Sequence, residues 1–229
     1  MLVLGIDSTS DAATAALTRD GVLLCEYTQN QKKTHSVKLL PMIEQMLADM
    51  EISLSDIDVF ACGIGPGSFT GVRIGAATMR AFCDSLHKPA TAVTSLEALA
   101  DNVSCFSGTI VPLVFARDGE CFISAYENST QILAPCVMTI EDITEFARDK
   151  TCIFVGDGAE KNRETLSAIP NATVADSRHN IVSAGAIATI GYKKALANDI
   201  GNSNIIAPLY LRKSQAEREY DEKHKTEER

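Results

Sequence analysis

The chain has no apolar run long enough to cross a membrane. A membrane-spanning helix needs about 18 consecutive apolar residues, and no segment of the 229 residues approaches that length. Residues 1–7 carry no basic segment and begin a strand-like pattern at once, so we expect no signal peptide. We therefore expect a cytoplasmic protein with no membrane partner.

Disulfide, metal and triad spacings are also missing. The seven cysteines lie singly, without a CxxC pair, and an odd number cannot pair completely. This favours buried thiols in a reducing compartment over a disulfide framework or a zinc site. The four histidines are scattered, without HxxxH or HExxH spacing, and no Ser, His and Asp arrangement is typical of a triad. We expect neither a metal site nor catalytic residues.

Basic residues are too few for direct nucleic-acid binding. The chain holds 21 basic and 30 acidic residues, and its net charge is −9. Charges balance within residues 212–229, which we expect to form a flexible tail, so residues 1–211 carry the whole acidic excess. Affinity for nucleic acid needs clustered Lys and Arg. A role in nucleic-acid chemistry would therefore depend on a partner.

The first half reads as a three-stranded meander followed by α/β units. Apolar patterns predict strands over residues 1–7, 12–18, 22–29, 57–64 and 89–93. Helical periodicity predicts helices over 36–50, 70–86 and 96–102. Asp20-Gly21 is a hairpin signal, and Thr94 with Glu97 is a capping-box signature.

The second half repeats this plan without visible sequence identity. Strands are expected over residues 110–116, 121–127, 131–137 and 152–155, with a hairpin at Asp118-Gly119. Helices are expected over 139–149, 159–168 and 181–197. The pattern predicts two α/β lobes with mixed sheets, an N-terminal lobe over 1–106 and a C-terminal lobe over 107–211.

The most informative segment is GPGSFTGVRIG at residues 65–75, which runs from a strand into a helix. Such a loop suits either anion binding or close packing, and local chemistry leaves both open. It is neither a P-loop nor a Rossmann motif. The polar turn of residues 7–10 and the glycine turn of residues 156–158 are equally ambiguous between ligand binding and structure. His35 precedes a helix, which favours a polar or capping role over catalysis.

These residues carry a resemblance to a known family. The eleven-residue motif, the preceding His35-Ser36-x-x-Leu39-Leu40-Pro41 and the following SLEALA at residues 95–100 resemble the bacterial TsaB (YeaZ) family. Ala116-Arg117, GDGA at residues 156–159 and PLYLR at residues 208–212 come next in the expected order. The resemblance therefore covers nearly the whole chain.

The resemblance implies a fold and a role. The fold is the two-lobed actin and sugar-kinase-like ATPase fold, a duplicated βββαβα unit with the ribonuclease H-like motif. The role is that of a non-catalytic subunit in forming N6-threonylcarbamoyladenosine in tRNA, bound to the paralogue TsaD and the ATPase TsaE. The tRNA would be contacted through the complex, and the isolated chain would form homodimers. The alternative is an independent nucleotide-binding ATPase or kinase of the same fold.

The resemblance also implies that the catalytic groups are missing. TsaD carries a metal-binding HxxxH where this chain has Ser95 and Leu99, and a hydroxyl and an aliphatic side chain cannot replace two imidazoles. TsaB relatives often keep an aspartate where this chain has Phe115, which can neither hold Mg²⁺ nor orient water. We expect no cofactor, and weak binding of ATP or ADP stays open.

Three sets of residues are implied by the resemblance. The partner interface comprises His35, Leu39, Leu40, Ile43, Met46, Leu47, Val72, Arg73, Gly75, Ala76, Met79 and Arg80. The family motif loop comprises Gly65, Pro66, Gly67, Ser68, Phe69, Thr70 and Gly71. A vestigial nucleotide site would comprise Asp7, Ser8, Thr9, Gly156 and Gly158.

Overall fold

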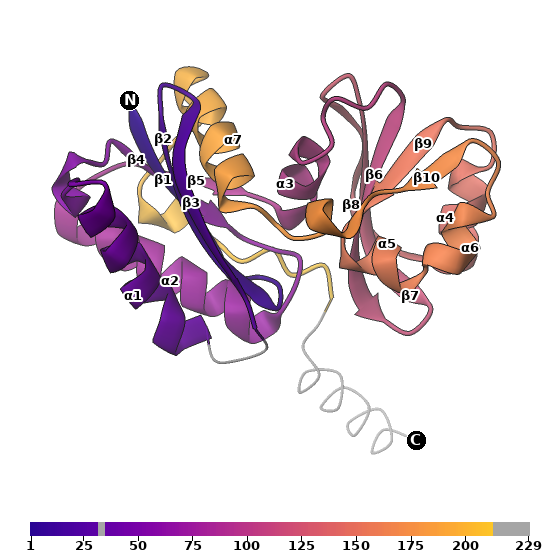
Figure 1. The fold of residues 1–229 in the computed structure, drawn as a ribbon, viewed down its shortest axis with the longest axis horizontal. Coiled ribbons are helices and arrows are strands. Elements are labelled where there is room, and N and C mark those ends of the chain that lie inside the picture. Colours follow the sequence, from indigo (N-terminus) through magenta and orange to yellow (C-terminus); the bar gives the residue numbers. More distant parts are fainter. Residues whose placement is uncertain (32–34, 213–229) are drawn as a thin grey trace, which may run out of the picture.

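The computed structural model describes residues 1–31 and 35–212, with backbone alone for residues 35 and 36. The first lobe is built on a five-stranded sheet in the order β3-β2-β1-β4-β5 (Figure 1). Its strands are β1 (Leu2–Asp7), β2 (Ala12–Arg19), β3 (Val22–Asn30), β4 (Val59–Gly63) and β5 (Ala90–Val93). The meander β1-β2-β3 is antiparallel, whereas β4 and β5 add parallel to β1. The predicted meander with α/β units is therefore confirmed.

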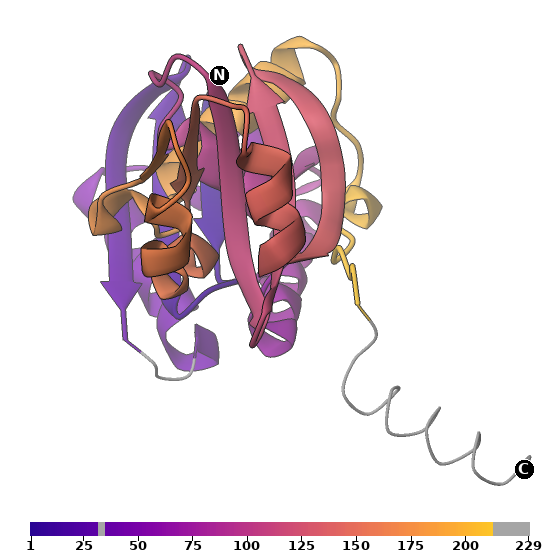
Figure 2. The ribbon, with the colours of Figure 1, turned by 90° about the vertical axis from the view of Figure 1, so that its right-hand side faces the viewer.

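The second lobe repeats this arrangement, and Figure 2 shows it in front of the first. Its sheet has the order β10-β9-β6-β7-β8. The strands are β6 (Thr109–Arg117), β7 (Glu120–Glu127), β8 (Thr130–Thr139), β9 (Cys152–Val155) and β10 (Ala172–Val174). The helices α4 (Ile140–Ala147), α5 (Asp157–Lys161) and α6 (Arg163–Ser167) lie on its outer face. The sequence did not predict β10, a three-residue edge strand with a single buried residue.

Each half of the chain contributes one helix that packs on the sheet of the other half. Helices α1 (His35–Asp49) and α2 (Phe69–Leu86) cover one face of the first sheet, and α7 (Ala184–Leu196) covers the other. Helix α3 (Ser95–Asp101), from the first half of the chain, packs on β6 and β7 of the second lobe. The predicted C-terminal lobe over 107–211 was therefore wrong for α7 and for the residues after it, because Ile206 also lies in the first core. An amphipathic pattern marks a buried face but not the sheet that buries it.

Local signals explain most element boundaries. Asp20 and Gly21 have φ of 52° and 78°, which is the left-handed backbone of a two-residue hairpin. Thr94 and Glu97 form the predicted capping box of α3.

The single helix predicted over 159–168 is instead broken into α5 and α6. It breaks because the Asn162 amide donates to the Gly158 carbonyl at 2.8 Å and so competes with the helical hydrogen bond.

All seven cysteines are free thiols. Cys62, Cys83, Cys121 and Cys152 are buried as predicted, two others are half-buried, and Cys105 is exposed. Among the residues that the structure describes, no helix is both long and apolar enough to span a bilayer.

Candidate functional site

The motif loop folds against the polar turn that follows the first strand. Strands β1 and β4 are parallel neighbours, so the segments that leave their carboxyl ends meet at one edge of the sheet. The Ser68 amide donates to the Thr9 carbonyl at 2.6 Å, and the Ser8 hydroxyl donates to the Gly71 carbonyl at 2.9 Å. Two of the segments singled out from the sequence therefore form one hydrogen-bonded unit.

Glycine is required at this contact because no side chain fits. A Cβ on Gly67 would lie 2.2 Å from the Thr9 carbonyl oxygen, and one on Gly71 would lie 1.8 Å from the Ser8 carbonyl oxygen. At Gly75 a Cβ would meet the Ser8 hydroxyl at 2.7 Å. The packing interpretation of these glycines is the one that the geometry supports.

The rest of the motif loop starts α2. Gly65 has φ of 94° and precedes a cis peptide bond to Pro66, and both residues are buried. The Ser68 hydroxyl accepts from the Gly71 amide at 3.2 Å and so caps the helix. Phe69 and Thr70 are exposed in its first turn.

The turn beneath the loop is sealed, and Asp7 is its most constrained residue. Asp7, Ser8 and Thr9 are 1%, 1% and 2% exposed. One Asp7 oxygen, Oδ2, accepts from the Thr9 amide at 3.0 Å and from its hydroxyl at 3.1 Å, whereas Oδ1 has no hydrogen-bond partner. Burial is the main cause that raises the pKa of the Asp7 carboxyl to about 7, against the lowering effect of the Thr9 bonds.

This buried carboxyl predicts a pH-dependent stability. Between pH ~4 and ~7 the folded state keeps a proton on Asp7 that the unfolded chain has lost, so stability falls as pH rises through that window. The contribution is on the order of 4 kcal/mol. Asp7→Asn cannot titrate there, so the stability of the variant relative to the native chain should rise as pH increases from ~4 to ~7. Urea unfolding at several pH values measures this difference.

The control for this prediction is an exposed carboxyl. Asp84→Asn removes one negative charge at an exposed position of α2 and controls for the loss of a carboxylate as such. The buried amide nitrogen that Asp7→Asn introduces adds a loss that is the same at every pH, so the difference in slope is the deciding quantity. If the unfolding free energies of the native chain and Asp7→Asn changed equally with pH, the pKa of Asp7 would not be raised in the folded state.

A cleft of about 460 Å³ lies between the lobes beside this sealed turn. Its walls include Thr9, Asp11, Phe115, Asp157 and Lys161. The Lys161 ammonium sits 3.3 Å from the centroid of the Phe115 ring, and Asp157 accepts from the Phe115 amide at 3.0 Å. The Phe115 ring therefore contacts the Lys161 ammonium in the wall of the cleft.

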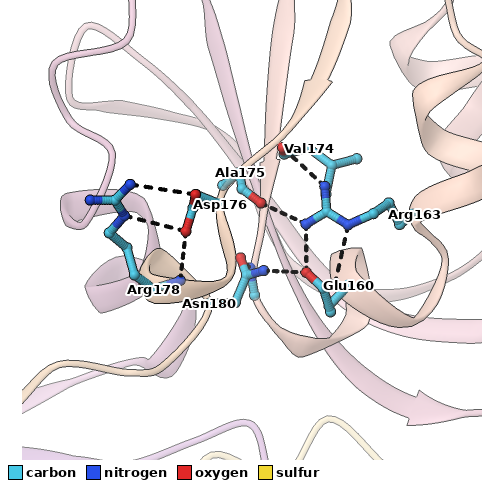
Figure 3. A network of polar contacts seen from close by, with 8 residues as sticks. Glu160, Arg163, Val174, Ala175, Asp176, Arg178 and Asn180 are labelled. Atoms are coloured by element: carbon cyan, nitrogen blue, oxygen red, sulfur yellow. Dashed lines mark hydrogen bonds and ion pairs between the residues drawn. The ribbon is translucent and has the colours of Figure 1, made fainter.

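A polar network fixes the wall of the cleft on the second lobe (Figure 3). Arg163 pairs with Glu160 at 2.5 Å and donates to the Ala175 carbonyl at 2.8 Å. Asn180 donates to Glu160 at 2.9 Å and accepts from the Gly156 amide at 2.8 Å. The Gly156 amide is therefore engaged inside the protein, although an open amide there would suit a phosphate.

The predicted nucleotide residues of the second lobe also serve packing. A Cβ on Gly156 would lie 2.3 Å from the Leu113 carbonyl oxygen, and one on Gly158 would lie 2.9 Å from the Cys121 sulfur. Both glycines let the turn lie close to β6 and β7. Thr9 is the one residue of the predicted nucleotide set that lines the cleft, and binding of ATP or ADP stays a prediction.

Most of the predicted partner interface is buried in the chain's own first core. This corrects the interface prediction for Leu39, Ile43, Met46, Leu47, Val72, Gly75, Ala76 and Met79, all of which are buried. A side chain packed against its own sheet cannot also contact a partner. Leu40 and Arg73 are exposed, and Arg80 is half-buried. The side chain of His35 lies outside the described residues.

The exposed faces of the same two helices hold Val37, Ala77 and Ala81, which the sequence reasoning missed, beside Leu40, which it included. Val37 and Leu40 of α1 are 68% and 43% exposed. Ala77 and Ala81 are exposed on α2, four residues apart and on the side of Arg73. The helical period gives the signal: with Val72, Ala76, Met79 and Cys83 facing the sheet, positions 73, 77 and 81 face outward.

The comparisons with known proteins agree with this geometry. The family model TsaD, tRNA N6-adenosine threonylcarbamoyltransferase, matches residues 22–220. The chain belongs to the TsaD family. Its relatives include TsaB proteins: the tRNA threonylcarbamoyladenosine biosynthesis protein TsaB of Bacillus subtilis is 29% identical over 98% of this chain and 100% of its own length.

Solved structures support the fold of this TsaD-family member. The structure of YeaZ from Pseudomonas aeruginosa superposes with a TM-score of 0.77 at 23% identity, over 92% of this chain and 99% of that one. The (R)-2-hydroxyglutaryl-CoA dehydratase component A of Acidaminococcus fermentans superposes with a TM-score of 0.51 at 11% identity, over 86% and 99%. The expected actin and sugar-kinase-like fold is confirmed.

The two positions at which the resemblance places metal-binding histidines are buried in this TsaD-family member. Ser95 and Leu99, where the resemblance places the metal-binding histidines of TsaD, are 0% and 1% exposed on α3. The Ser95 and Thr9 hydroxyls are hydrogen-bonded at 2.8 Å. Among the described residues, no group of three or more His, Cys, Asp or Glu side chains is arranged to hold a metal ion.

Proposed function

We propose that this chain is a non-catalytic subunit of the machinery that makes N6-threonylcarbamoyladenosine in tRNA. Membership of the TsaD family and the likeness to TsaB proteins support a role in this biosynthesis. In this proposal the chain binds and activates a TsaD-type catalytic paralogue, and TsaE joins the two. The acidic body leaves tRNA to the basic surfaces of the partners.

The observation that carries the proposal is the sealed turn at the end of β1. Its backbone and hydroxyls are hydrogen-bonded to the motif loop and to Ser95, and three glycines of the motif leave no space between them. The Ser8 and Thr9 hydroxyls, which could otherwise bind a phosphate, are therefore engaged internally. Phe115 in the opposite wall of the cleft supplies no ligand for Mg²⁺.

The partner would dock on the outward faces of α1 and α2. Exposed Val37 and Leu40 supply apolar contact area, and Ala77 and Ala81 let another helix approach closely. Arg73 lies at the rim of this surface, where charged groups set orientation. In the absence of the catalytic paralogue, two copies of the chain would pair through the same faces.

The test is direct binding between purified proteins. Isothermal titration of this chain into its cognate TsaD-type protein should give a saturable complex, and titration with ATP or ADP should give weak binding or none. Incubation with ATP alone should release no phosphate. A chain that hydrolyses ATP without partners and ignores the TsaD-type protein would instead be the free-standing ATPase of the alternative.

A further inference from the structure

The segment after the last 3-10 helix lies across the motif loop and the side of α2. The Leu209 amide donates to the Ile64 carbonyl at 2.8 Å, directly beyond the end of β4. The Arg80 guanidinium of α2 donates through Nε to the Ile206 carbonyl at 2.9 Å. The chain is thus held to the first lobe by its backbone before it reaches residue 210.

An aromatic and cationic cluster fastens the same segment to the first turn of α2. The Tyr210 and Phe69 rings stack with centroids 4.8 Å apart, and the Arg73 guanidinium lies 3.9 Å from the centroid of Phe69. Arg73 also donates to the Tyr210 hydroxyl at 3.0 Å. Phe69 and Tyr210 are 36% and 45% exposed, so a protein docked on this face of α2 would cover them.

The far end of the segment touches the other lobe. Arg212 lies 3.9 Å from Glu120 at the start of β7, and both side chains are about one-fifth exposed. Glu120 also accepts from Arg117 at 2.7 Å. In Figure 1 the segment, drawn in yellow, runs from the left-hand lobe toward the right-hand one. It therefore connects the exposed face of α2 with the second lobe.

Other links between the lobes lie around α3 and α7, which share one hydrophobic core. The chain crosses after α3 and again before α7, and the Asn102 amide joins the two crossings by donating to the His179 and Ile181 carbonyls at 2.9 and 2.8 Å. The contact between Arg212 and Glu120 is a separate link, made by the segment of residues 207–212 itself.

We propose that residues 207–212 form a strap that couples the partner-binding face of α2 to the angle between the lobes. A partner that covers Phe69, Arg73 and Tyr210 holds the strap in place and keeps Arg212 against Glu120. Binding is reciprocal: the factor by which the partner stabilises the strap equals the factor by which an intact strap strengthens partner binding. The coupling to the partner rests on the proposed function, whereas the fastening of the lobes does not.

The fastening is tested on the free chain by hydrogen exchange of the Leu209 amide. Glu120→Gln weakens the contact with Arg212, so exchange at Leu209 should become several-fold faster although the substitution lies in the other lobe. Arg117→Gln is the matched control, because it removes a different interaction of Glu120 and leaves the strap contact. Equal exchange in the native chain and Glu120→Gln would overturn the fastening.

The coupling is tested by titrating the TsaD-type partner into full-length variants. Tyr210→Ala should weaken binding by about tenfold, with an unchanged melting temperature, whereas Leu196→Ala, at an exposed site on α7, should not weaken it. The chain has no tryptophan, so Tyr210→Trp also supplies a single fluorophore whose emission should shift when the partner binds. Native affinity in Tyr210→Ala would overturn the coupling and leave the proposed function standing. If the native chain does not bind the partner, both the proposed function and the coupling are wrong. The contact between the strap and the second lobe is then still tested by hydrogen exchange of the Leu209 amide.

Discussion

A Gly71→Ala variant should lose about 3 kcal/mol or more of unfolding free energy. The added Cβ would lie 1.8 Å from the Ser8 carbonyl oxygen and 3.3 Å from the Cβ of Ser68. The oxygen belongs to the backbone directly after β1, so it cannot swing aside as the end of a long side chain would. Alanine in a helix gains only about 1 kcal/mol over glycine, so the clash decides the sign. Urea unfolding followed by circular dichroism measures the loss.

The matched control is the same substitution at a glycine with room. A Cβ on Gly201 would meet Ile205 at 3.6 Å, which is ordinary contact. Gly201→Ala should therefore stay within about 0.5 kcal/mol of the native chain. If Gly71→Ala were as stable as Gly201→Ala, the motif loop would not seal the turn of residues 7–10.

An Ala77→Arg variant should weaken binding of the TsaD-type partner at least about a hundredfold. Ala77 lies on the outward face of α2, so the new side chain puts bulk and charge where another helix must approach closely. Folding should be unaffected, because the position is exposed and arginine is a good helix former. Titration calorimetry with matched melting curves separates the two effects.

The control places the same change on the other lobe. Ala168→Arg alters an exposed alanine after α6 and should bind the partner with native affinity. Equal affinities for both arginine variants would mean that the partner does not dock on α2. Gel filtration of the free chain adds a second readout, since Ala77→Arg should also abolish pairing between copies.

Much of the architecture was accessible from the sequence because local signals agree with the final packing. The hairpin at Asp20-Gly21 and the capping box at Thr94 and Glu97 formed as the residue types require. Apolar periodicity likewise located α1 and α2 to within a residue at each end. Turn chemistry and caps act over a few residues, so no knowledge of the tertiary structure is needed to read them.

Features set by distant contacts were not accessible. A period of 3.6 residues shows that α7 has a buried side, but not which sheet it covers. In the structure α7 packs closely on Gly5 of β1, where a Cβ would lie 2.7 Å from the Ala184 carbonyl oxygen. Eight residues of the predicted interface set are buried for a related reason. Gly75 and Ala76 looked suited to a partner helix, yet both are buried, and a Cβ on Gly75 would meet the Ser8 hydroxyl at 2.7 Å.

The most direct test of the proposed subunit role is the rate of N6-threonylcarbamoyladenosine formation in tRNA by the cognate TsaD-type and TsaE proteins, with and without this chain. We expect little product without the chain, full activity when the native chain is added, and no recovery with Ala77→Arg. Equal rates with and without the chain would contradict this role, as would turnover of ATP by the isolated chain at a comparable rate.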